Sequence, residues 1–432
     1  MLQAMSDQTQ MVTLGCRLNI HESHVMQDLA TKAGLEKAII VNTCAVTSEA
    51  ERQARQTIRR LRKDNPEAFI IVTGCAVQLR PEVFGKMPEV NRVLGNDIKL
   101  KASSFAKDFP YRVAVGPIER QISEDFPLLK KFEGKTRAFV QVQNGCDHRC
   151  AFCNIPFARG SSRSVPLGLV VQQVQWLHQS GVKEVIFTGV DLTSYGKGLP
   201  GDLTLGRMLR RVLMQVPAMD RFRLSSLDSI EIDEELFHLL AHEPRLLPHL
   251  HLSLQAGSNA ILKAMRRRHL REESIDFCKR LLKERPDYAL GADFIVGFPG
   301  ETEEMFQETM DLVDECRLSH LHVFPFSARP GTLAFKMEDK VPGPVIKERA
   351  ARLRQKAKQA LDQKLGQYLG QQVDILMEEN NTGYTKDFLR VAVQNAGASS
   401  CVPGQILRVT IQDRAPQGLV GILDETDTQG YA

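Results

Sequence analysis

The sequence predicts an α/β protein in three parts: an N-terminal open parallel α/β sheet, a central partial barrel of six βα units and a small C-terminal β-barrel. Apolar, β-branched runs alternate with helix-like stretches, which is typical of parallel strands joined by helices. This alternation restarts after a less periodic stretch, which we interpret as a linker. Near the C-terminus only short strand-like runs broken by Gly, Asn and Ser remain. The expected boundaries are 9–105, 106–133 (linker), 134–363 and 364–425, with a tail at 426–432.

Each of the first three strand-like runs ends on a cysteine. The runs MVTLGC, KAIIVNTC and AFIIVTGC end on Cys16, Cys44 and Cys75, and a helix-like stretch follows each of them. The carboxyl ends of parallel strands line up along one edge of a sheet, where ligands bind. We therefore expect these three thiols, far apart in the sequence, to lie together at one edge of the first sheet.

The second series of strands begins after Thr136. Six helix-like segments accompany its strands, at about 166–179, 205–215, 231–240, 258–266, 302–316 and 344–365. Six βα units predict a partial barrel with its site at the carboxyl ends of the strands. The strand candidates are RAFVQVQ, EVIFTG, RFRLSS, LHLSLQ, ADFIVG and LHVFPFS.

The last part contains the strand candidates VDILMEEN, FLRVAVQ, QILRVTIQ and GLVGIL. Four basic and eight acidic residues follow Gly370, so this part carries a net charge of −4 and the preceding residues carry +8. An anionic partner should therefore bind mainly to the first two parts of the chain. The composition, with 43% hydrophobic and 25% charged residues, is typical of a globular protein.

The sequence favours a cytoplasmic protein without a membrane anchor. The N-terminus is polar and has no apolar segment of the kind found in signal peptides, and runs such as AIIV are too short to span a bilayer. Nine cysteines, an odd number with uneven spacing, favour metal or catalytic roles over a disulfide framework. Cys278, Cys316 and Cys401 have no partner at metal-ligand spacing, so we interpret them as bystanders.

The segment GCDHRCAFCNIPFARG at 145–160 places Cys146, Cys150 and Cys153 within eight positions. A structural zinc site needs four closed ligands. His148 lies between two of the cysteines, where it would reach the metal only with strain, and no second CxxC pair follows nearby. A 4Fe–4S cluster normally takes four thiolates, so three would leave one iron open to another ligand. The loop follows the first barrel strand, where chemistry is expected.

The C-x3-C-x2-C spacing, with Phe152 before the last cysteine, resembles the signature of radical S-adenosylmethionine (SAM) enzymes. The motifs TLGCRLN, NTCAVT and TGC resemble the N-terminal domain of the methylthiotransferases among them, and the C-terminal part resembles their TRAM domain. The resemblance implies two 4Fe–4S clusters that face each other across a cleft. It also implies that SAM serves both as radical source, through a 5′-deoxyadenosyl radical, and as methyl donor. The ligands would be Cys146, Cys150 and Cys153 for the radical-generating cluster and Cys16, Cys44 and Cys75 for the sulfur-donating cluster.

Within this family, the stretch KTRAFVQVQNGCDHRCAFCNIPFARGSSRS is most similar to the branch that modifies N6-threonylcarbamoyladenosine in tRNA. That branch adds a methylthio group to C2 of the adenine beside the anticodon. The implied partners are a tRNA anticodon stem–loop, a flavodoxin- or ferredoxin-like electron donor and a sulfur source. One alternative keeps the chemistry on N6-isopentenyladenosine of tRNA or on an aspartate of a ribosomal protein. A more distant alternative is a non-enzymatic iron–sulfur RNA-binding or carrier protein.

The segment TGVDL at 188–192 resembles the glycine-and-acid motif that binds the amino group of SAM in these enzymes. Val190 stands where a second glycine is usual, and the acid is an aspartate, shorter than the usual glutamate. Each candidate residue at a strand end could instead be a turn or packing residue. The residues predicted to contact SAM are Phe152, Gly189, Asp191 and Gln255.

A helix-like stretch, AERQARQTIRRLRK, carries arginines on one face and Ala, Ile and Leu on another. A solvated helix face is the ordinary explanation for such charge. The functional explanation is contact with RNA phosphates, which would make the binding of RNA salt-dependent. In the acidic C-terminal part, Tyr384 and Phe388 could stack on RNA bases, although packing explains Phe388 equally well. The predicted RNA-contacting residues are Arg52, Arg55, Arg59 and Arg62.

Overall fold

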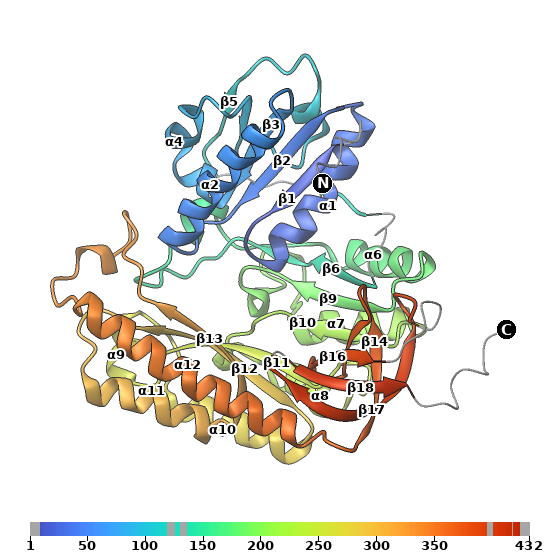
Figure 1. Ribbon diagram of the computed structural model, residues 1–432, viewed down its shortest axis with the longest axis vertical. Coiled ribbons are helices and arrows are strands. Elements are labelled where there is room, and N and C mark those ends of the chain that lie inside the picture. Colours follow the sequence, from blue (N-terminus) through green and yellow to red (C-terminus); the bar gives the residue numbers. More distant parts are fainter. Residues whose placement is uncertain (1–8, 119–125, 130–135, 395–400, 417, 424–432) are drawn as a thin grey trace.

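The protein is described by a computed structural model with three connected parts (Figure 1). A five-stranded sheet comes first, two three-stranded parallel sheets follow, and a closed five-stranded barrel ends the chain. The predicted α/β class with a small C-terminal barrel is confirmed. The described residues are 9–118, 126–129, 136–394, 401–416 and 418–423. The predicted tail at 426–432 and the last two residues of the predicted C-terminal part, 424 and 425, therefore lie outside the described residues.

The first sheet is wholly parallel, in the order β1-β2-β3-β4-β5. Strands β2 and β3 are made of β-branched and apolar residues that lie almost completely buried. The third helix-like stretch is split into α3 and α4 because Pro81 lacks the N–H needed inside a helix. The elements are β1 (Gln10–Thr13), α1 (Arg17–Lys32), β2 (Ala38–Thr43), α2 (Ser48–Asp64), β3 (Phe69–Gly74), α3 (Cys75–Leu79), α4 (Pro81–Gly85), β4 (Arg92–Leu94), η1 (Ala102–Phe105) and β5 (Val113–Ala114).

Two strands of this sheet were not predicted from the sequence. Strands β4 and β5 have three and two residues, too short for a hydrophobic pattern to emerge. Val113 pairs with Val93 in parallel register, so this piece of the predicted linker at 106–133 belongs to the first sheet. The linker prediction was wrong for these residues.

The central part contains all six predicted strands. Two parallel sheets, β10-β9-β6 and β11-β12-β13, are joined through isolated bridges from Phe222 to Leu246 and from Leu227 to Leu252. They form one curved wall with β6 and β13 as its edges. The elements are β6 (Arg137–Gln141), β7 (Gln143–Asn144), α5 (Ile155–Arg159), β8 (Arg163–Ser164), α6 (Leu167–Gln179), β9 (Glu184–Thr188), η2 (Leu192–Ser194), α7 (Leu205–Gln215), β10 (Phe222–Leu224), η3 (Ser229–Glu231), α8 (Glu234–His242), β11 (His249–Gln255), α9 (Asn259–Ala264), α10 (Arg271–Glu284), β12 (Ala289–Val296), α11 (Glu303–Glu315), β13 (Leu318–Pro325), η4 (Ala334–Lys336) and α12 (Gly343–Gly366).

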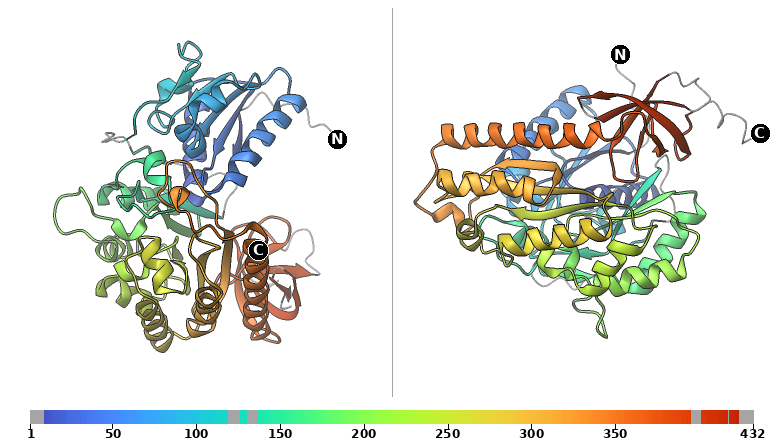
Figure 2. Two further views of the ribbon diagram at one scale, coloured as in Figure 1. Left: turned by 90° about the vertical axis from the view of Figure 1, so that its left-hand side faces the viewer. Right: turned by 90° about the horizontal axis from the view of Figure 1, so that it is seen from below.

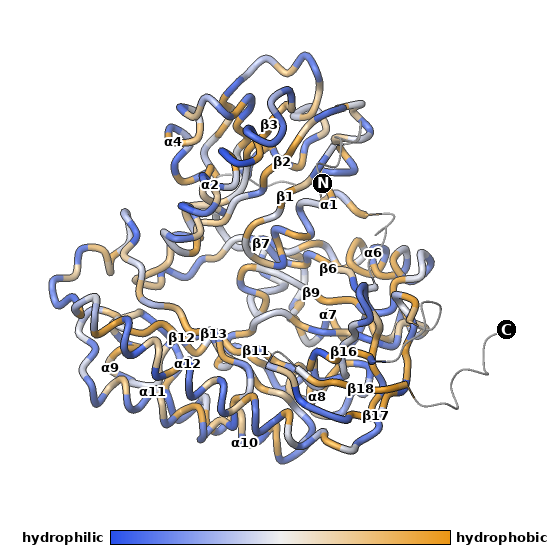
Figure 3. The backbone as a smooth tube through the Cα atoms, viewed as in Figure 1, coloured by the Kyte–Doolittle hydropathy of each residue, from blue (hydrophilic) through white to orange (hydrophobic). Residues whose placement is uncertain are grey.

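Helix α10 is a 14-residue helix that the sequence analysis missed. Its buried positions are Ser274, Phe277, Cys278 and Leu281, at the spacing of one helical face. Only two of these four residues are strongly apolar, so the hydrophobic pattern was weak. The outer helices show the expected alternation of polar and apolar positions along the backbone (Figure 3).

The C-terminal part is a closed barrel in the order β14-β15-β16-β18-β17. Closure leaves no unpaired strand edge, which suits a small all-β unit. Strand β15 has three residues and was not predicted. Helix α12, orange in Figure 2, leads into this barrel. The strands are β14 (Gln372–Met377), β15 (Thr382–Tyr384), β16 (Arg390–Gln394), β17 (Ile406–Ala415) and β18 (Gly418–Leu423).

A loop of the C-terminal barrel packs against the central strands. The Phe388 ring lies 5.0 Å from the His249 ring and 4.8 Å from the guanidinium carbon of Arg223. Its backbone has φ of 71°, which is uncommon outside glycine. Tyr384 stacks on Phe388 at 5.0 Å and lies 4.3 Å from the guanidinium carbon of Arg137. Both rings therefore take part in the contact between the two barrels, and stacking on RNA bases stays a prediction.

The first sheet is also fixed to the far edge of the partial barrel. After β13, Arg329 forms an ion pair with the buried Glu51 of α2. It also donates a hydrogen bond to Ser48 Oγ at 3.0 Å. The Ser48 N–H in turn donates to Ser327 Oγ at 3.2 Å. These contacts hold the start of α2 over the end of β13.

The contact between the two barrels should be sensitive to pH. Burial lowers the pKa of His320 to about 4 and the pKa of His249 well below its ordinary value. Both imidazoles are neutral in the folded protein but take up a proton near pH 6.5 once unfolded. Their contribution to stability is therefore complete above pH 6.5 and is lost as the pH falls toward 4. We expect each histidine to cost about 1–2 kcal/mol of unfolding free energy at pH 5.

Thermal unfolding at pH 7.5 and pH 5.0 measures this loss. The double variant His249→Asn and His320→Asn should show a much smaller difference between the two pH values than the native protein. His238→Gln, on the exposed side of α8, is the matched control and should keep the full difference. An unchanged difference in the double variant would show that these histidines are not the source.

Candidate active site

The first cysteine trio lies at the carboxyl ends of three adjacent strands. Cys16 is the residue before α1, Cys44 follows β2, and Cys75 begins α3 directly after β3. Burial, followed by the charges of Cys75 and Cys16, raises the pKa of Cys44 to about 12, so the three thiols are electrostatic neighbours. A Cβ at Gly15, which has φ of 105°, would lie 2.9 Å from Cys44 Sγ. The glycine permits this close approach of the first loop to the second.

The second cysteine trio occupies the loop between β7 and α5. The Cys146 N–H donates to Gly160 O at 3.0 Å, and the Cys153 N–H donates to Cys150 O at 3.1 Å. Gly145 has φ of 75°, and a Cβ there would lie 2.0 Å from a backbone oxygen of the returning chain. The loop is thereby folded back on itself, with its thiols grouped at the end of the first barrel strand.

The two trios face each other between the first sheet and the partial barrel. Arg159, at the end of α5, donates from Nε to Cys75 Sγ at 3.2 Å. Asn96 donates from Nδ2 to Ala158 O at 2.8 Å and lies 3.9 Å from the same sulfur. Helix α5, which follows the second trio, therefore lies against the sulfur of the first.

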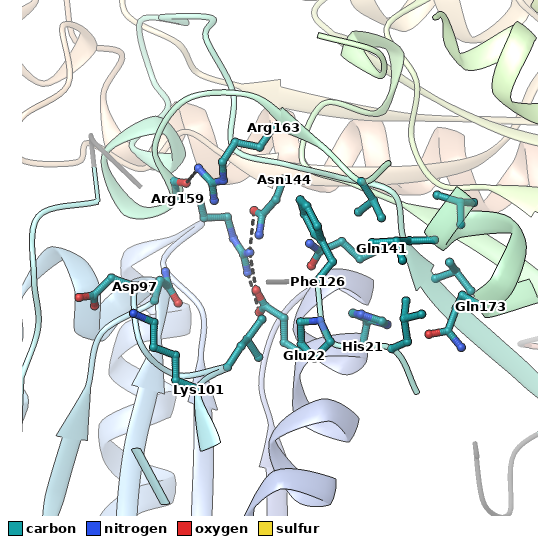
Figure 4. Close-up of a pocket in the computed structure, with 18 of the residues that line it drawn as sticks. His21, Glu22, Asp97, Lys101, Phe126, Gln141, Asn144, Arg159, Arg163 and Gln173 are labelled. Atoms are coloured by element: carbon teal, nitrogen blue, oxygen red, sulfur yellow. Dashed lines mark hydrogen bonds and ion pairs between the residues drawn. The ribbon is translucent and has the colours of Figure 1, made fainter. Parts of the chain in front are cut away.

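A buried ion network centred on Arg159 holds the two trios in this arrangement (Figure 4). Its Nη1 donates to Glu22 Oε1 at 2.8 Å and to Asn144 Oδ1 at 3.1 Å, and its Nη2 donates to Asn19 Oδ1 at 2.7 Å. Lys99 Nζ lies 2.6 Å from Glu22 Oε2. Burial would raise the pKa of Glu22, but the charges of Arg159 and Lys99 outweigh it and lower the pKa to about 2. The carboxylate is thus permanently charged and joins α1 to α5.

The donor set fits iron–sulfur clusters better than single metal ions. Among the described residues, neither trio has all three sulfur atoms within 4.8 Å of one another. A tetrahedral zinc site would place its sulfurs at about 3.8 Å from each other. N–H groups also point at the sulfurs: in addition to Arg159, Arg267 Nη1 lies 3.7 Å from Cys150 Sγ. Such donors stabilise thiolates and tune cluster potentials.

Asp191 lies beside the second trio. Its Oδ2 is 3.7 Å from Cys146 Sγ and 2.9 Å from His148 Nε2. These three ligand atoms lie within 4.8 Å of one another, the spacing of a mononuclear metal site, but such a site would leave Cys150 and Cys153 unused. Asp191 and Glu231, which accept hydrogen bonds from the imidazole, raise the pKa of His148 to about 9. The arrangement places a carboxylate next to the first sulfur, where it can accept hydrogen bonds from an ammonium group.

Gln143 fixes the loop that carries Asp191, and the sequence analysis missed it. Its Oε1 accepts from the N–H groups of Val190 at 3.0 Å and Asp191 at 2.9 Å. Its Nε2 donates to Gly145 O at 2.8 Å. A Cβ at Gly189 would lie 2.8 Å from Gln143 Oε1, which explains the glycine there. The only signal in the sequence was a glutamine within a strand-like run.

Phe152 and Gln255 line one pocket between the two trios, together with Cys153 and, from the first sheet, Val46 and Thr47. Gln255 has φ of 69°, a strained conformation for a residue with a side chain. Strain of this kind concentrates at functional sites. The structure thus brings two of the four predicted SAM contacts into one pocket, whereas Gly189 and Asp191 are not among the residues that line it.

A second set of residues missed by the sequence analysis lies on the inner face of β11, β12 and β13. Asp293, which lines the same pocket, accepts from His251 Nε2 at 2.9 Å and from His322 Nδ1 at 3.0 Å through one oxygen. Burial would raise the pKa of Asp293, but the two imidazoles lower it well below its ordinary value. No separate signal marks these residues in the sequence, because they alternate with apolar ones as in any barrel strand.

The four arginines of α2 differ in their surroundings. Arg62 donates to Glu89 O, Pro66 O, Ala68 O and Asn91 Oδ1, so its guanidinium holds the helix to neighbouring loops. Arg52 pairs with Glu49 and Arg59 lies 3.8 Å from Glu89, and both are exposed. Arg55 is partly exposed. Arg52, Arg55 and Arg59 therefore remain predicted RNA contacts, whereas the donors of Arg62 are largely occupied within the protein.

Two family descriptions match the chain. Residues 140–313 match the radical SAM superfamily, and residues 8–95 match uncharacterized protein family UPF0004. The chain is also similar to the radical SAM methyltransferase TsrM from Kitasatospora setae, solved with cobalamin and a [4Fe-4S] cluster bound. That similarity has a TM-score of 0.55 at 16% identity and covers 76% of this chain and 77% of the other, so it supports the fold alone.

Curated relatives are similar over nearly their whole length. The threonylcarbamoyladenosine tRNA methylthiotransferase MtaB of Rickettsia prowazekii (strain Madrid E) is 48% identical over 88% of this chain and 90% of its own. MtaB of Bacillus subtilis (strain 168) is 34% identical over 92% of both chains. The tRNA-2-methylthio-N(6)-dimethylallyladenosine synthase of Rickettsia rickettsii (strain Sheila Smith) is 32% identical over 96% of this chain and 99% of its own. Across the described residues, every helix is too short or too polar to cross a membrane.

The Arg159 network should be essential for stability. Glu22→Gln would leave the charges of Arg159 and Lys99 buried without their counter-charge. Removing one partner of a buried ion pair is strongly destabilising, and we expect a loss of about 3 kcal/mol. The midpoint of urea unfolding measures it. Glu36→Gln, exposed just after the same helix, is the control and should have no measurable effect. A Glu22→Gln midpoint equal to that of the control would contradict this role.

Proposed function

The chain belongs to the radical SAM methylthiotransferase family, and from this we propose that it adds a methylthio group to C2 of N6-threonylcarbamoyladenosine beside the anticodon of tRNA. The observation that carries the proposal is the 48% identity, over 90% of its length, to a relative named for this substrate. The two cysteine trios that face each other match the chemistry, since one site must activate C2 and another must hold sulfur. The protein is an enzyme, a SAM-dependent methylthiotransferase.

The choice of substrate branch rests on degree of similarity. Relatives named for threonylcarbamoyladenosine reach 48% identity, whereas those named for the dimethylallyl nucleoside reach 32%. The sister substrates therefore remain the alternative outcome of the test below. A carrier without enzymatic activity is disfavoured, because the chain is similar to tRNA-modifying enzymes along nearly its whole length.

The cofactors are 4Fe–4S clusters and SAM. Three thiolates per cluster would leave one iron of each open. When bound, these groups supply a carbon radical that can remove the unreactive hydrogen at C2, sulfide for the new bond and a methyl group from a second SAM. The ligands we propose are Cys146, Cys150 and Cys153 for the radical-generating cluster, and Cys16, Cys44 and Cys75 for the sulfur-donating cluster.

Other residues of the chain position the reactants. Asp191, 3.7 Å from Cys146 Sγ, is placed to accept hydrogen bonds from the SAM ammonium group, and Gln143 holds its loop through two backbone N–H groups. Phe152 and Gln255, the predicted SAM contacts, line the pocket in which we place SAM and, beside it, the target adenine. The buried Arg159 keeps the two trios in register, so that hydrogen removal and sulfur transfer occur on the same base.

Helix α2 is the proposed contact to the anticodon stem. The pocket-lining residues Val46 and Thr47 lead directly into α2, and Thr47 caps the helix by accepting from Ala50 N at 3.1 Å. Exposed arginines thus extend from the pocket mouth along the surface, where phosphates of a stem–loop could be neutralised. A flavodoxin- or ferredoxin-like electron donor, a sulfur source and a cytoplasmic location complete the proposal.

The two trios should be separately necessary. Changing Cys146, Cys150 and Cys153 to Ala should abolish formation of 5′-deoxyadenosine, whereas changing Cys16, Cys44 and Cys75 to Ala should leave it and abolish the methylthio product. Intact protein should bind about eight irons per chain after anaerobic reconstitution, and each triple variant about half as many. Iron analysis and chromatography of the SAM products measure these outcomes.

The matched control is Cys401→Ala, a cysteine of the C-terminal barrel that should keep all the iron and full activity. Methylthio product at the native level from the variant of Cys16, Cys44 and Cys75 would be fatal to this division of roles. Binding of only one cluster by the intact protein would count against it as well.

Cells that lack this protein should retain threonylcarbamoyladenosine in tRNA and lose its methylthio form. The reason is that the methylthio group is added to the already modified nucleoside. Mass spectrometry of tRNA nucleosides from a deletion strain, with a complemented strain as control, makes the measurement. Loss of the methylthio group from isopentenyladenosine instead would assign the protein to the sister branch.

A further inference from the structure

The inside of the partial barrel, on the side of the C-terminal barrel, carries more positive than negative charge. Arg221 and Arg223 form ion pairs with the buried Glu184 at 3.0 and 2.8 Å, and Arg137 lies 3.9 Å from the same carboxylate. Glu378 of the C-terminal barrel accepts a hydrogen bond from Arg137 Nε at 2.9 Å. Three guanidiniums thus share two carboxylates in a poorly solvated space.

Arg17 adds a fourth guanidinium to this group. It is the first residue of α1, directly after Cys16, and its guanidinium carbon lies 5.7 Å from the centre of the Phe388 ring. Burial and the charges of Arg137 and Arg223 lower its pKa from the ordinary value. Among the described residues, the structure records no hydrogen bond or ion pair for this guanidinium. The side chain is partly exposed, so its N–H groups remain available to a ligand.

Asp293 connects Arg17 to the pocket. This carboxylate lines the pocket with Phe152 and Gln255, and its negative charge acts on Arg17. One of its oxygens already accepts hydrogen bonds from His251 and His322, and no ion pair with Arg17 forms. Arg17 therefore lies within the electrostatic reach of a carboxylate that lines the pocket, and among the described residues it has no ion pair of its own.

The other carboxylate that acts on Arg17, that of Glu184, is already paired with the neighbouring arginines. Arg137 Nη1 is buried and lacks a hydrogen-bond partner among the described residues. Glu184 is already shared by three guanidiniums. An excess of buried cations is costly unless an anion joins them. The geometry thus calls for a ligand with a negatively charged oxygen group.

We propose that Arg17 binds the carboxylate of the threonylcarbamoyl group and thereby selects this nucleoside over uncharged ones. The inference rests on the proposed function, which places the adenine in the pocket. A guanidinium pairs with a carboxylate through two parallel hydrogen bonds, which gives both affinity and orientation. An isopentenyl group has no charge, so it would leave Arg17 without a counter-charge and would bind less well.

A backbone phosphate of the same RNA is the other possible source of the anion, and the test distinguishes the two sources. Three anticodon stem–loop RNAs of one sequence are used, carrying threonylcarbamoyladenosine, its uncharged carboxamide analogue or isopentenyladenosine. Binding to the reconstituted protein with both clusters is measured at constant salt. The native protein should bind the carboxylate RNA about tenfold or more tightly than the carboxamide RNA, as expected for loss of one charge-assisted contact.

Arg17→Gln should bind the carboxylate and carboxamide RNAs with nearly equal affinity, and Arg17→Lys should keep part of the difference. Arg210→Gln, on the exposed side of α7, is the matched control and should keep all of it. Because Arg17 adjoins Cys16, iron content and SAM cleavage of each variant are measured to show that both clusters are intact. If Arg17→Gln instead weakens both RNAs equally, the anion is a phosphate and the proposal is overturned.

The same RNAs separate this inference from the proposed function. If the native protein methylthiolates the carboxylate and carboxamide RNAs with equal kcat/KM and equal affinity, the function stands and the role of Arg17 is refuted. If it methylthiolates only the isopentenyladenosine RNA, the proposed function itself fails. A tenfold preference that persists in Arg17→Gln would place recognition of the carboxylate on another residue.

Discussion

The buried ion pair between Arg159 and Glu22 is the interaction on which the site depends. Glu22 belongs to the helix that starts directly after Cys16, and Arg159 ends the helix that follows Cys153. Their bidentate contact therefore fixes the distance between two loops that come from different sheets. Neither cysteine trio could be aligned with the other by its own loop alone. The cost of burying these charges is offset by Lys99, Asn19 and Asn144, which complete the network.

Much of this arrangement could be predicted from the sequence because local patterns encode it. Cysteines at the ends of successive β-branched runs predicted one shared sheet edge, and the spacing of Cys146, Cys150 and Cys153 predicted a cluster loop. The network itself could not be predicted, since Arg159 and Glu22 are 137 residues apart and each resembles an ordinary helix charge. Very short strands such as β5 were missed because two residues are too few to show a periodic pattern.

The inner face of the partial barrel is unusually polar for a core. Histidines, arginines and carboxylates take positions that apolar residues fill in a barrel built for stability alone, and several of them have strongly shifted pKa values. Burial of such groups reduces the stability of the fold unless each is paired. Their partial pairing is consistent with an interior arranged around a charged, hydrogen-bonding substrate. Sites at which local rules fail in this way are where function is expected.

The loop that carries Phe388 makes the C-terminal barrel part of the interior of the central part. Its ring lies among the guanidiniums of Arg17, Arg137 and Arg223, so the arginine cluster inside the partial barrel is bordered by a unit that looks autonomous in the sequence. Exchange of this barrel between related enzymes is therefore constrained by the shape of this contact. A recombined chain would retain these contacts to the arginines only if the incoming loop carried a flat aromatic group in the same left-handed backbone conformation.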